Sequence, residues 1–164
     1  GEYKVIAPGT KKDNAAMVTL SGQPEVSVKV TYSADTFSLT GKWEGDENGT
    51  FYCPLIIKVT GKVGDTVTTE TINCAEKNSA ADIQTAVQNA VAACSATYAP
   101  NTDLSTAAVA GEGLKISWEW PFEGTANPGQ TDAKDTYLGN QAAAGGLNVP
   151  AIHIPVTATV TQID

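Results

Sequence analysis

Apolar and polar residues alternate along several stretches of this chain, most clearly at its C-terminal end. In Ala151–Asp164, apolar side chains occupy every second position from Ile152 to Val160, with polar residues or proline between them. This period of two predicts one β-strand with a buried face and a solvated face. Similar patterns predict strands at Glu25–Tyr32, Thr36–Trp43, Phe51–Thr60, Thr66–Asn73 and Lys115–Trp120. In Phe51–Thr60 the apolar run Leu55–Ile57 indicates a strand buried on both faces.

Helical periodicity interrupts the strands at one place and is weaker at a second. Ser79 with Asp82 resembles a capping box, and small apolar residues then recur at a spacing of three or four, which predicts a helix over about 79–94. Thr131 is a candidate cap for a short helix over about 132–138, with Gly139-Asn140 as its stop. About eight strands with one or two inserted helices predict an all-β fold, a jelly-roll-like β-sandwich.

The N-terminal residues differ from the remainder of the chain. Glu2–Ala7 is a short extended segment that Pro8-Gly9 closes, and the polar stretch Thr10–Ala16 has the composition of a linker. We therefore expect a segment 1–16, made of a strand and a linker, followed by a single domain over 17–164, a length that supports a sizeable core.

Composition and charge narrow the class of protein. The chain has 41% hydrophobic and 17% charged residues, a net charge of −8 and no arginine, which makes nucleic acid an unfavourable partner. No apolar run reaches the roughly 18 residues of a membrane span. The chain starts at Gly1 without a signal peptide, which we interpret as a mature, processed and secreted protein.

The 3 cysteines allow at most one internal disulfide. If Phe51–Thr60 and Thr66–Cys74 form a hairpin, Cys53 and Cys74 lie almost opposite each other, and Cys94 belongs to the apolar stripe of the first helix. Cys53–Cys74 is therefore the preferred pair. Cys53–Cys94 and three reduced thiols stay open as alternatives.

Catalytic and metal-binding patterns are weak. His153 is the only histidine, and neither a zinc motif nor a phosphate-binding glycine loop occurs, so we expect no enzyme, cofactor or metal site. Four carboxylates gather towards the C-terminal part, where a glycosidase would need two across a cleft, but solvated acidic loops are the simpler interpretation; they are Glu119, Glu123, Asp132 and Asp135. Asn48-Gly49-Thr50 fits a glycosylation sequon, although Asn-Gly is first a hairpin turn.

Several short motifs together resemble the TasA/camelysin-like family of exported biofilm-matrix fibre proteins of Gram-positive bacteria, which is related to archaeal bundling pili. The motifs span most of the chain and are Val5–Thr10, Gly22–Val26, Tyr52-Cys53-Pro54, Trp118-Glu119-Trp120, Asp135–Gly139 and Thr157–Asp164. Camelysin itself is described as a metallopeptidase, and the missing histidine-based zinc motif keeps that activity from being carried over.

The resemblance implies a subunit that polymerises outside the cell, at the cell surface or in the biofilm matrix. In that family an N-terminal strand completes the sheet of the next subunit, so other copies of the chain are its partners, and other matrix components are allowed. The donor here would consist of Glu2, Tyr3, Lys4, Val5, Ile6 and Ala7. The alternative for this segment is pairing within its own subunit.

The sequence thus supports two functions from different classes. The first is the structural subunit of an extracellular filament that assembles head-to-tail by strand donation. The second is a monomeric cell-surface adhesive or carbohydrate-binding β-sandwich, in which Trp43, Trp118 or Trp120 would stack on sugars. The alternation around Trp118 and Trp120 favours core positions for both.

Overall fold

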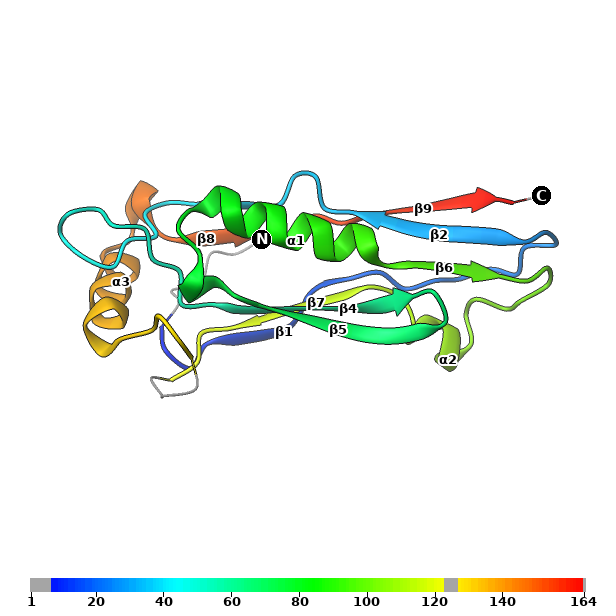
Figure 1. Cartoon of the computed structure of the whole chain (residues 1–164), viewed down its shortest axis with the longest axis horizontal. Coiled ribbons are helices and arrows are strands. Elements are labelled where there is room, and N and C mark those ends of the chain that lie inside the picture. Colours follow the sequence, from blue (N-terminus) through cyan, green and yellow to red (C-terminus); the bar gives the residue numbers. More distant parts are fainter. Residues whose placement is uncertain (1–6, 123–126, 164) are drawn as a thin grey trace.

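β-Strands that run along one long axis form most of the molecule (Figure 1). The computed structural model describes residues 7–122 and 127–163. Its strands are β1 (Lys11–Met17), β2 (Val28–Ser33), β3 (Ser38–Thr40), β4 (Ile56–Val63), β5 (Thr66–Asn73), β6 (Ser95–Tyr98), β7 (Lys115–Glu119), β8 (Ala151–His153) and β9 (Thr157–Gln162). The helices are α1 (Ala80–Ala93), α2 (Ala107–Ala110) and α3 (Asp132–Ala144), with short 3₁₀ turns at Cys74–Glu76 and Gly146–Asn148.

Seven strands form one curled, mixed sheet. Its order is β1-β7-β4-β6-β2-β9, and β5 pairs with the other side of β4. The two halves of this path meet at a single parallel residue pair, Val63 with Ser95, between β4 and β6. The strands β3 and β8 form a separate two-stranded sheet. The chain is therefore β-rich with few helices, in agreement with the coarse fold prediction.

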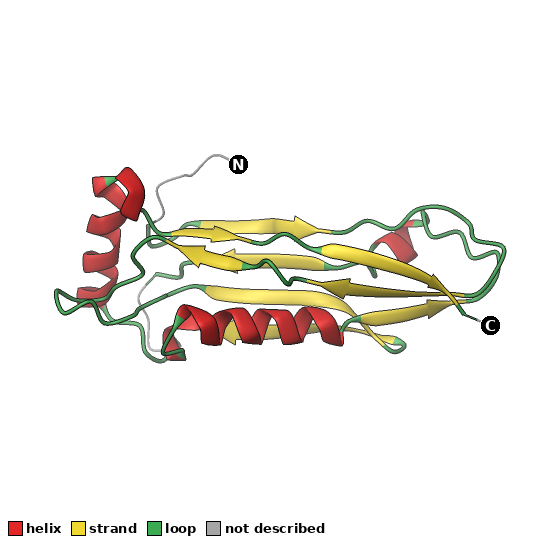
Figure 2. Cartoon of the chain, turned by 90° about the horizontal axis from the view of Figure 1, so that it is seen from above, coloured by secondary structure: helices red, strands yellow, loops and turns green. Residues whose placement is uncertain are grey.

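Helix α1 packs against β2 and β4 and covers part of the core (Figures 1 and 2). Its N-cap is Ser79, whose hydroxyl accepts a hydrogen bond from the backbone N–H of Asp82 at 3.1 Å. The apolar stripe that predicted the helix is buried, and its buried members are Ile83, Val87, Ala90 and Val91. Because this stripe repeats with the helical period, burial of one helix face was predictable from the sequence.

The predicted alternation holds in β2 and β7 and fails in part at the C-terminus. In β7, Ile116 and Trp118 are buried while Lys115 is exposed. The stretch Ala151–Asp164 is two strands rather than one, because the chain leaves β8 at Ile154-Pro155-Val156 and joins another sheet as β9. Proline cannot donate a backbone hydrogen bond, which explains a break at this point.

Three other local predictions were wrong. The predicted linker Thr10–Ala16 falls largely in the edge strand β1, where four polar side chains are exposed and the ladder has an irregularity between Lys12 and Ala16. Helix α3 does not stop at Gly139 but continues to Ala144. The strand β4 begins at Ile56 and buries alternate residues, so it is not buried on both faces.

The turn predicted at Asn48-Gly49 is confirmed. Gly49 has φ 77°, and its backbone N–H donates to the carbonyl of Asp46 at 3.2 Å. Hydrogen bonds from Thr50 and then Asn48 hold the pKa of Asp46 below its usual value. A carboxylate that accepts backbone N–H groups in this way stabilises a tight turn.

Candidate functional site

The predicted donor strand lies almost wholly outside the described residues, which begin at its last member. Glu2, Tyr3, Lys4, Val5 and Ile6 are therefore not placed. Ala7 is exposed, and it opens a turn in which its N–H donates to Thr10 Oγ1 at 3.0 Å and its carbonyl accepts from the Thr10 N–H at 2.9 Å.

This turn is fixed to the fold through glycine. Gly9 has φ 93°, and a Cβ at this position would come within 2.5 Å of the Phe122 ring, so only glycine fits without strain. The Gly9 N–H donates to the Trp120 carbonyl at 2.7 Å, and the Trp120 N–H donates to the Thr10 carbonyl at 2.8 Å. Because Trp120 is fully buried, the chain enters the fold at a rigid point beside the end of β7.

The opposite end of the sheet path is the strand β9, and all six of its residues are exposed. Its partner is β2, in a register that pairs Val160 with Val30 and Ala158 with Tyr32. Directly paired residues share a face of a sheet, and Val30 and Tyr32 are buried in the core. Val160 and Ala158 therefore lie on the core side, yet Val160 is 54% exposed.

The outer edge of β9 is also uncovered, because no other strand pairs with it within residues 7–122 and 127–163. An edge of this kind offers unpaired backbone groups to another strand. The edge strand β1 differs, because its N-terminal half carries the exposed charged residues Lys11, Lys12 and Asp13. On the edge strand β5, Val67 is exposed and pairs with Lys62 of β4. Lys62 is on the face of β4 that points away from the core, so Val67 lies on that face too. Among the described edges of the seven-stranded sheet, only β9 has uncovered apolar residues on the core side.

Helix α3 is held by a buried carboxylate, Asp135, which is 4% exposed. Its Oδ1 accepts hydrogen bonds from Tyr52 Oη at 2.5 Å and Trp120 Nε1 at 3.1 Å, and its Oδ2 accepts one from Gln130 Nε2 at 2.7 Å. Burial, followed by the hydrogen bond to Asp135, raises the pKa of Tyr52 above its usual value. We call this set of four residues the Asp135 cluster.

The Asp135 cluster corrects one prediction. Asp135 is neither a solvated loop residue nor a catalytic acid facing a cleft, because three neutral donors occupy its oxygens inside the core. Two of the other carboxylates do not join it, since Asp132 is exposed and Glu119 pairs with Lys11 and Ile56 in the sheet. Glu123 lies outside the described residues. Sequence reasoning named Tyr52 in a family motif, Trp120 also as a candidate for sugar stacking and Asp135 also as a candidate carboxylate, but it did not connect the three, and it missed Gln130.

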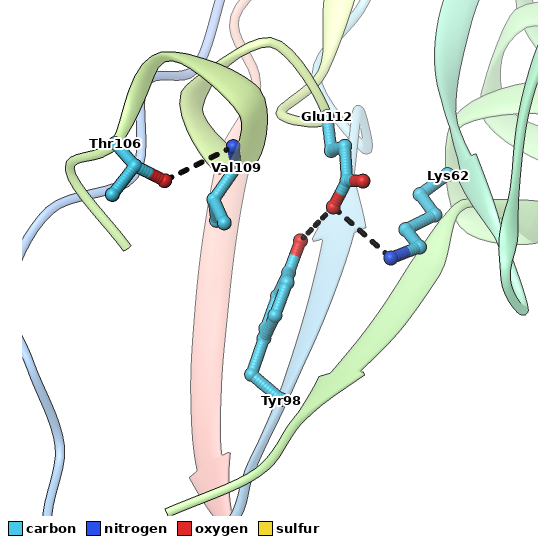
Figure 3. A network of polar contacts seen from close by, with 5 residues as sticks. All are labelled: Lys62, Tyr98, Thr106, Val109 and Glu112. Carbon is cyan, nitrogen blue, oxygen red and sulfur yellow. Dashed lines mark hydrogen bonds and ion pairs between the residues drawn. The ribbon is translucent and has the colours of Figure 1, made fainter. Parts of the chain in front are cut away.

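A second polar cluster, drawn in Figure 3, joins the ends of β4 and β6, which lie away from α3 (Figure 1). Glu112 Oε2 accepts hydrogen bonds from Lys62 Nζ at 3.0 Å and from Tyr98 Oη at 3.3 Å. The Lys62 ammonium also lies 5.3 Å from the centre of the Tyr98 ring. Tyr98 pairs with Val28, which pairs with Gln162 of β9, so this Glu112 cluster supports the part of the sheet that carries β9.

Neither of these clusters groups the side chains that a metal site needs. In the part of the chain that the structure describes, no three His, Cys, Asp or Glu side chains come together as a metal ion would require.

A shallow depression lies elsewhere on the sheet and is lined by Lys11, Lys58, Trp118 and Glu119, among others. Its volume of about 160 Å³ is below the roughly 300 Å³ at which small-molecule pockets begin.

The tryptophans and cysteines are in the core. Trp43, Trp118 and Trp120 are 4%, 8% and 0% exposed, so none of them offers a ring face for stacking on sugars. All three cysteines are buried thiols in this structure, and the predicted hairpin around Cys53 and Cys74 is present as β4 and β5.

Comparison with known proteins gives no relative: no protein-family model, curated protein or solved structure matches the chain. Among the described residues, no helix combines the length and the apolar character that crossing a membrane requires.

Proposed function

We propose that this chain is the structural subunit of an extracellular filament, built head-to-tail when the N-terminal strand Glu2–Ala7 of one subunit pairs with β9 of the next. The observation that carries the proposal is the uncovered core-side face of β9. Val160 is more than half exposed although it pairs directly with fully buried Val30. The family resemblance of the sequence supports the same function.

The alternation of apolar residues in Ala151–Asp164 specifies a buried face, and the single subunit completes only half of it. Ile152, Ile154 and Val156 pack against the core, whereas Ala158 and Val160 are exposed. An added strand along the edge of β9 would extend the sheet and cover these two residues. Tyr3 and Val5 alternate in the donor segment, so both can lie on the face that meets Val160.

The arrangement of the two ends supports a polymer. The start of β1 lies at the α3 end of the molecule, and β9 lies at the opposite end (Figure 1). Figure 2, turned by 90°, again shows α3 and the C-terminus at opposite ends. A donor that precedes the start of β1 and an acceptor at the opposite end would make a heterologous contact, which continues as a filament unless its rotation closes a ring.

This proposed function also implies the type of fold, the location and the partners of the protein. The curled sheet, whose two halves meet at one residue pair, is a jelly-roll-like sandwich that the donated strand completes. The protein is secreted, works at the cell surface or in a biofilm matrix, has other copies of itself as partners, and catalyses no reaction.

Deletion of Gly1–Ala7 tests the donor. The truncated chain keeps Gly9 and Thr10, which are bonded to Trp120, so we expect a folded monomer that forms no filaments in electron micrographs. A synthetic peptide with the sequence of residues 1–7 should bind this monomer and raise its melting temperature, because it supplies the missing strand. Filaments of normal length from the truncated chain would disprove strand donation.

Two matched substitutions in β9 test the acceptor. Val160→Asp places a charge on the core-side face where the donor would pack, and it should abolish peptide binding and filaments. Thr159→Asp places the same charge on the other face of the same strand, and filaments should persist. If both variants assemble equally well, β9 is not the acceptor.

A further inference from the structure

Cys53 and Cys74 are brought together by the β4–β5 hairpin at the end away from its turn. The register pairs Ile56 with Asn73, and the Cys74 N–H continues the ladder by donating to the Leu55 carbonyl at 3.0 Å. In an antiparallel pair, residues two apart on one strand share a face. This register therefore places Cys53 and Cys74 on the same face, as diagonal neighbours.

Both cysteine side chains lie inside the core. Both residues are 0% exposed. Burial raises the pKa of Cys53 well above its usual value, and a hydrogen bond with the Cys74 thiol raises it further. Two thiols that hydrogen-bond to one another face each other, as the two sulfur atoms of a disulfide must.

Cys94 occupies a different place. It is the C-cap of α1, and its thiol donates to the Ala90 carbonyl at 3.5 Å. It packs beside Gly61, where a Cβ would come within 2.8 Å of the Cys94 sulfur. With a rise of about 3.3 Å per residue, Gly61 lies about 17 Å along β4 from Ile56, so Cys94 is remote from the other two sulfurs.

We propose that Cys53 and Cys74 form a disulfide in the exported protein and that Cys94 stays a thiol. The oxidant is the disulfide of a thiol–disulfide oxidoreductase or of oxidised glutathione. One cysteine thiolate attacks that disulfide to give a mixed disulfide, and the second thiolate displaces the oxidant, which leaves as two thiols. The two cysteine protons pass to solvent and on to the released thiols. The reaction takes place during folding, because both sulfurs are inaccessible afterwards.

This bond would lock the start of β4 to the end of β5. Cys53 follows Tyr52, which donates to Asp135, so the crosslink also restrains the support of α3. The inference rests on the hairpin, on the burial of the two thiols and on the proposed export to an oxidising environment, and it holds whether or not the chain forms filaments.

Peptide mapping of the full chain tests the pairing. The protein is refolded with oxidised glutathione, denatured without reductant, alkylated and digested with trypsin. Cleavage after lysine places Cys53, Cys74 and Cys94 on separate peptides, 43–58, 63–77 and 78–115. We expect 43–58 linked to 63–77, and 78–115 alkylated.

Three alkylated cysteines, or any link to the peptide that carries Cys94, would overturn the proposal. As a control, Cys94→Ser should keep the same linked pair. Refolding under reductant should lower the melting temperature of the wild type and of Cys94→Ser by several degrees. It should leave the double variant Cys53→Ala/Cys74→Ala unchanged, and an equal drop in that double variant would also overturn the proposal.

Discussion

The Asp135 cluster and the Glu112 cluster share a plan but differ in burial. In each, a carboxylate accepts a hydrogen bond from a tyrosine, Tyr52 for Asp135 and Tyr98 for Glu112. In each, a lysine ammonium lies over that tyrosine ring, at 5.6 Å and 5.3 Å from its centre. The carboxylate of Glu112, however, is 26% exposed and paired with Lys62, whereas Asp135 is 4% exposed.

The difference shows how each end of the molecule is stabilised. Asp135 has lost its water and depends on three hydrogen bonds from neutral donors, which are strong inside the core and leave a costly charge if one is removed. Glu112 keeps contact with solvent, and ion pairs there contribute little. We therefore expect the α3 end to be the more rigid of the two and the end that carries β9 to be the more adaptable, as the proposed acceptor role requires.

Replacing the buried carboxylate should have the largest effect. Asp135→Ala removes the acceptor of Tyr52 Oη and Trp120 Nε1 and one of the two acceptors of Gln130 Nε2. It should lower the free energy of unfolding by about 3 kcal/mol, measured by urea denaturation. Asp132→Ala, in the exposed first turn of the same helix, is the control and should cost under about 1 kcal/mol. Equal losses in both variants would mean that the Asp135 hydrogen bonds contribute nothing specific.

Alkaline pH should weaken the Glu112 cluster. Burial, followed by the negative charge of Glu112, raises the pKa of Tyr98 to about 12, above the usual value of about 10. The resulting stabilisation is fully present below pH 10 and is lost as the pH rises through 12. Tyr98→Phe should make the fall in unfolding free energy over this range shallower, although Tyr52 and Tyr32, whose pKa values are also raised, still contribute. An unchanged slope would contradict the assignment.

The smallest effect is expected for the half-exposed ion pair. Glu112→Gln removes the charge that faces Lys62 but keeps an oxygen for Tyr98, and it should cost less than about 1 kcal/mol. Raising the salt concentration should shrink the difference from the wild type further. A loss as large as that of Asp135→Ala would show that the two clusters are equivalent after all.

The sequence predicted those features that one element, or two elements next to each other in the chain, determine. The helix α1 and the buried faces of β2 and β7 follow from periodicity alone. The β4–β5 hairpin follows from two strands and a short turn, and its register places Cys53 and Cys74 on one face at its open end.

Features that depend on distant partners could not be predicted. Thr10–Ala16 has the composition of a linker, and only pairing with β7 makes most of it a strand. Gly139 usually ends a helix, but burial of Leu138 and Ala142 on one side carries α3 past it. The burial of Asp135 requires donors from Tyr52, which is 83 residues away in the sequence, and no local pattern reveals such a contact.

The direction of the strands has a mechanical consequence. The strands β2 and β9 lie along the long axis of the molecule (Figure 1) and pair over six residues, and hydrogen bonds between antiparallel strands are perpendicular to them. A force along this axis therefore slides the two strands past each other and loads all their hydrogen bonds together. A force across the axis would open them one after another. A thread of subunits joined end to end along this axis would resist tension in the stronger of these two geometries.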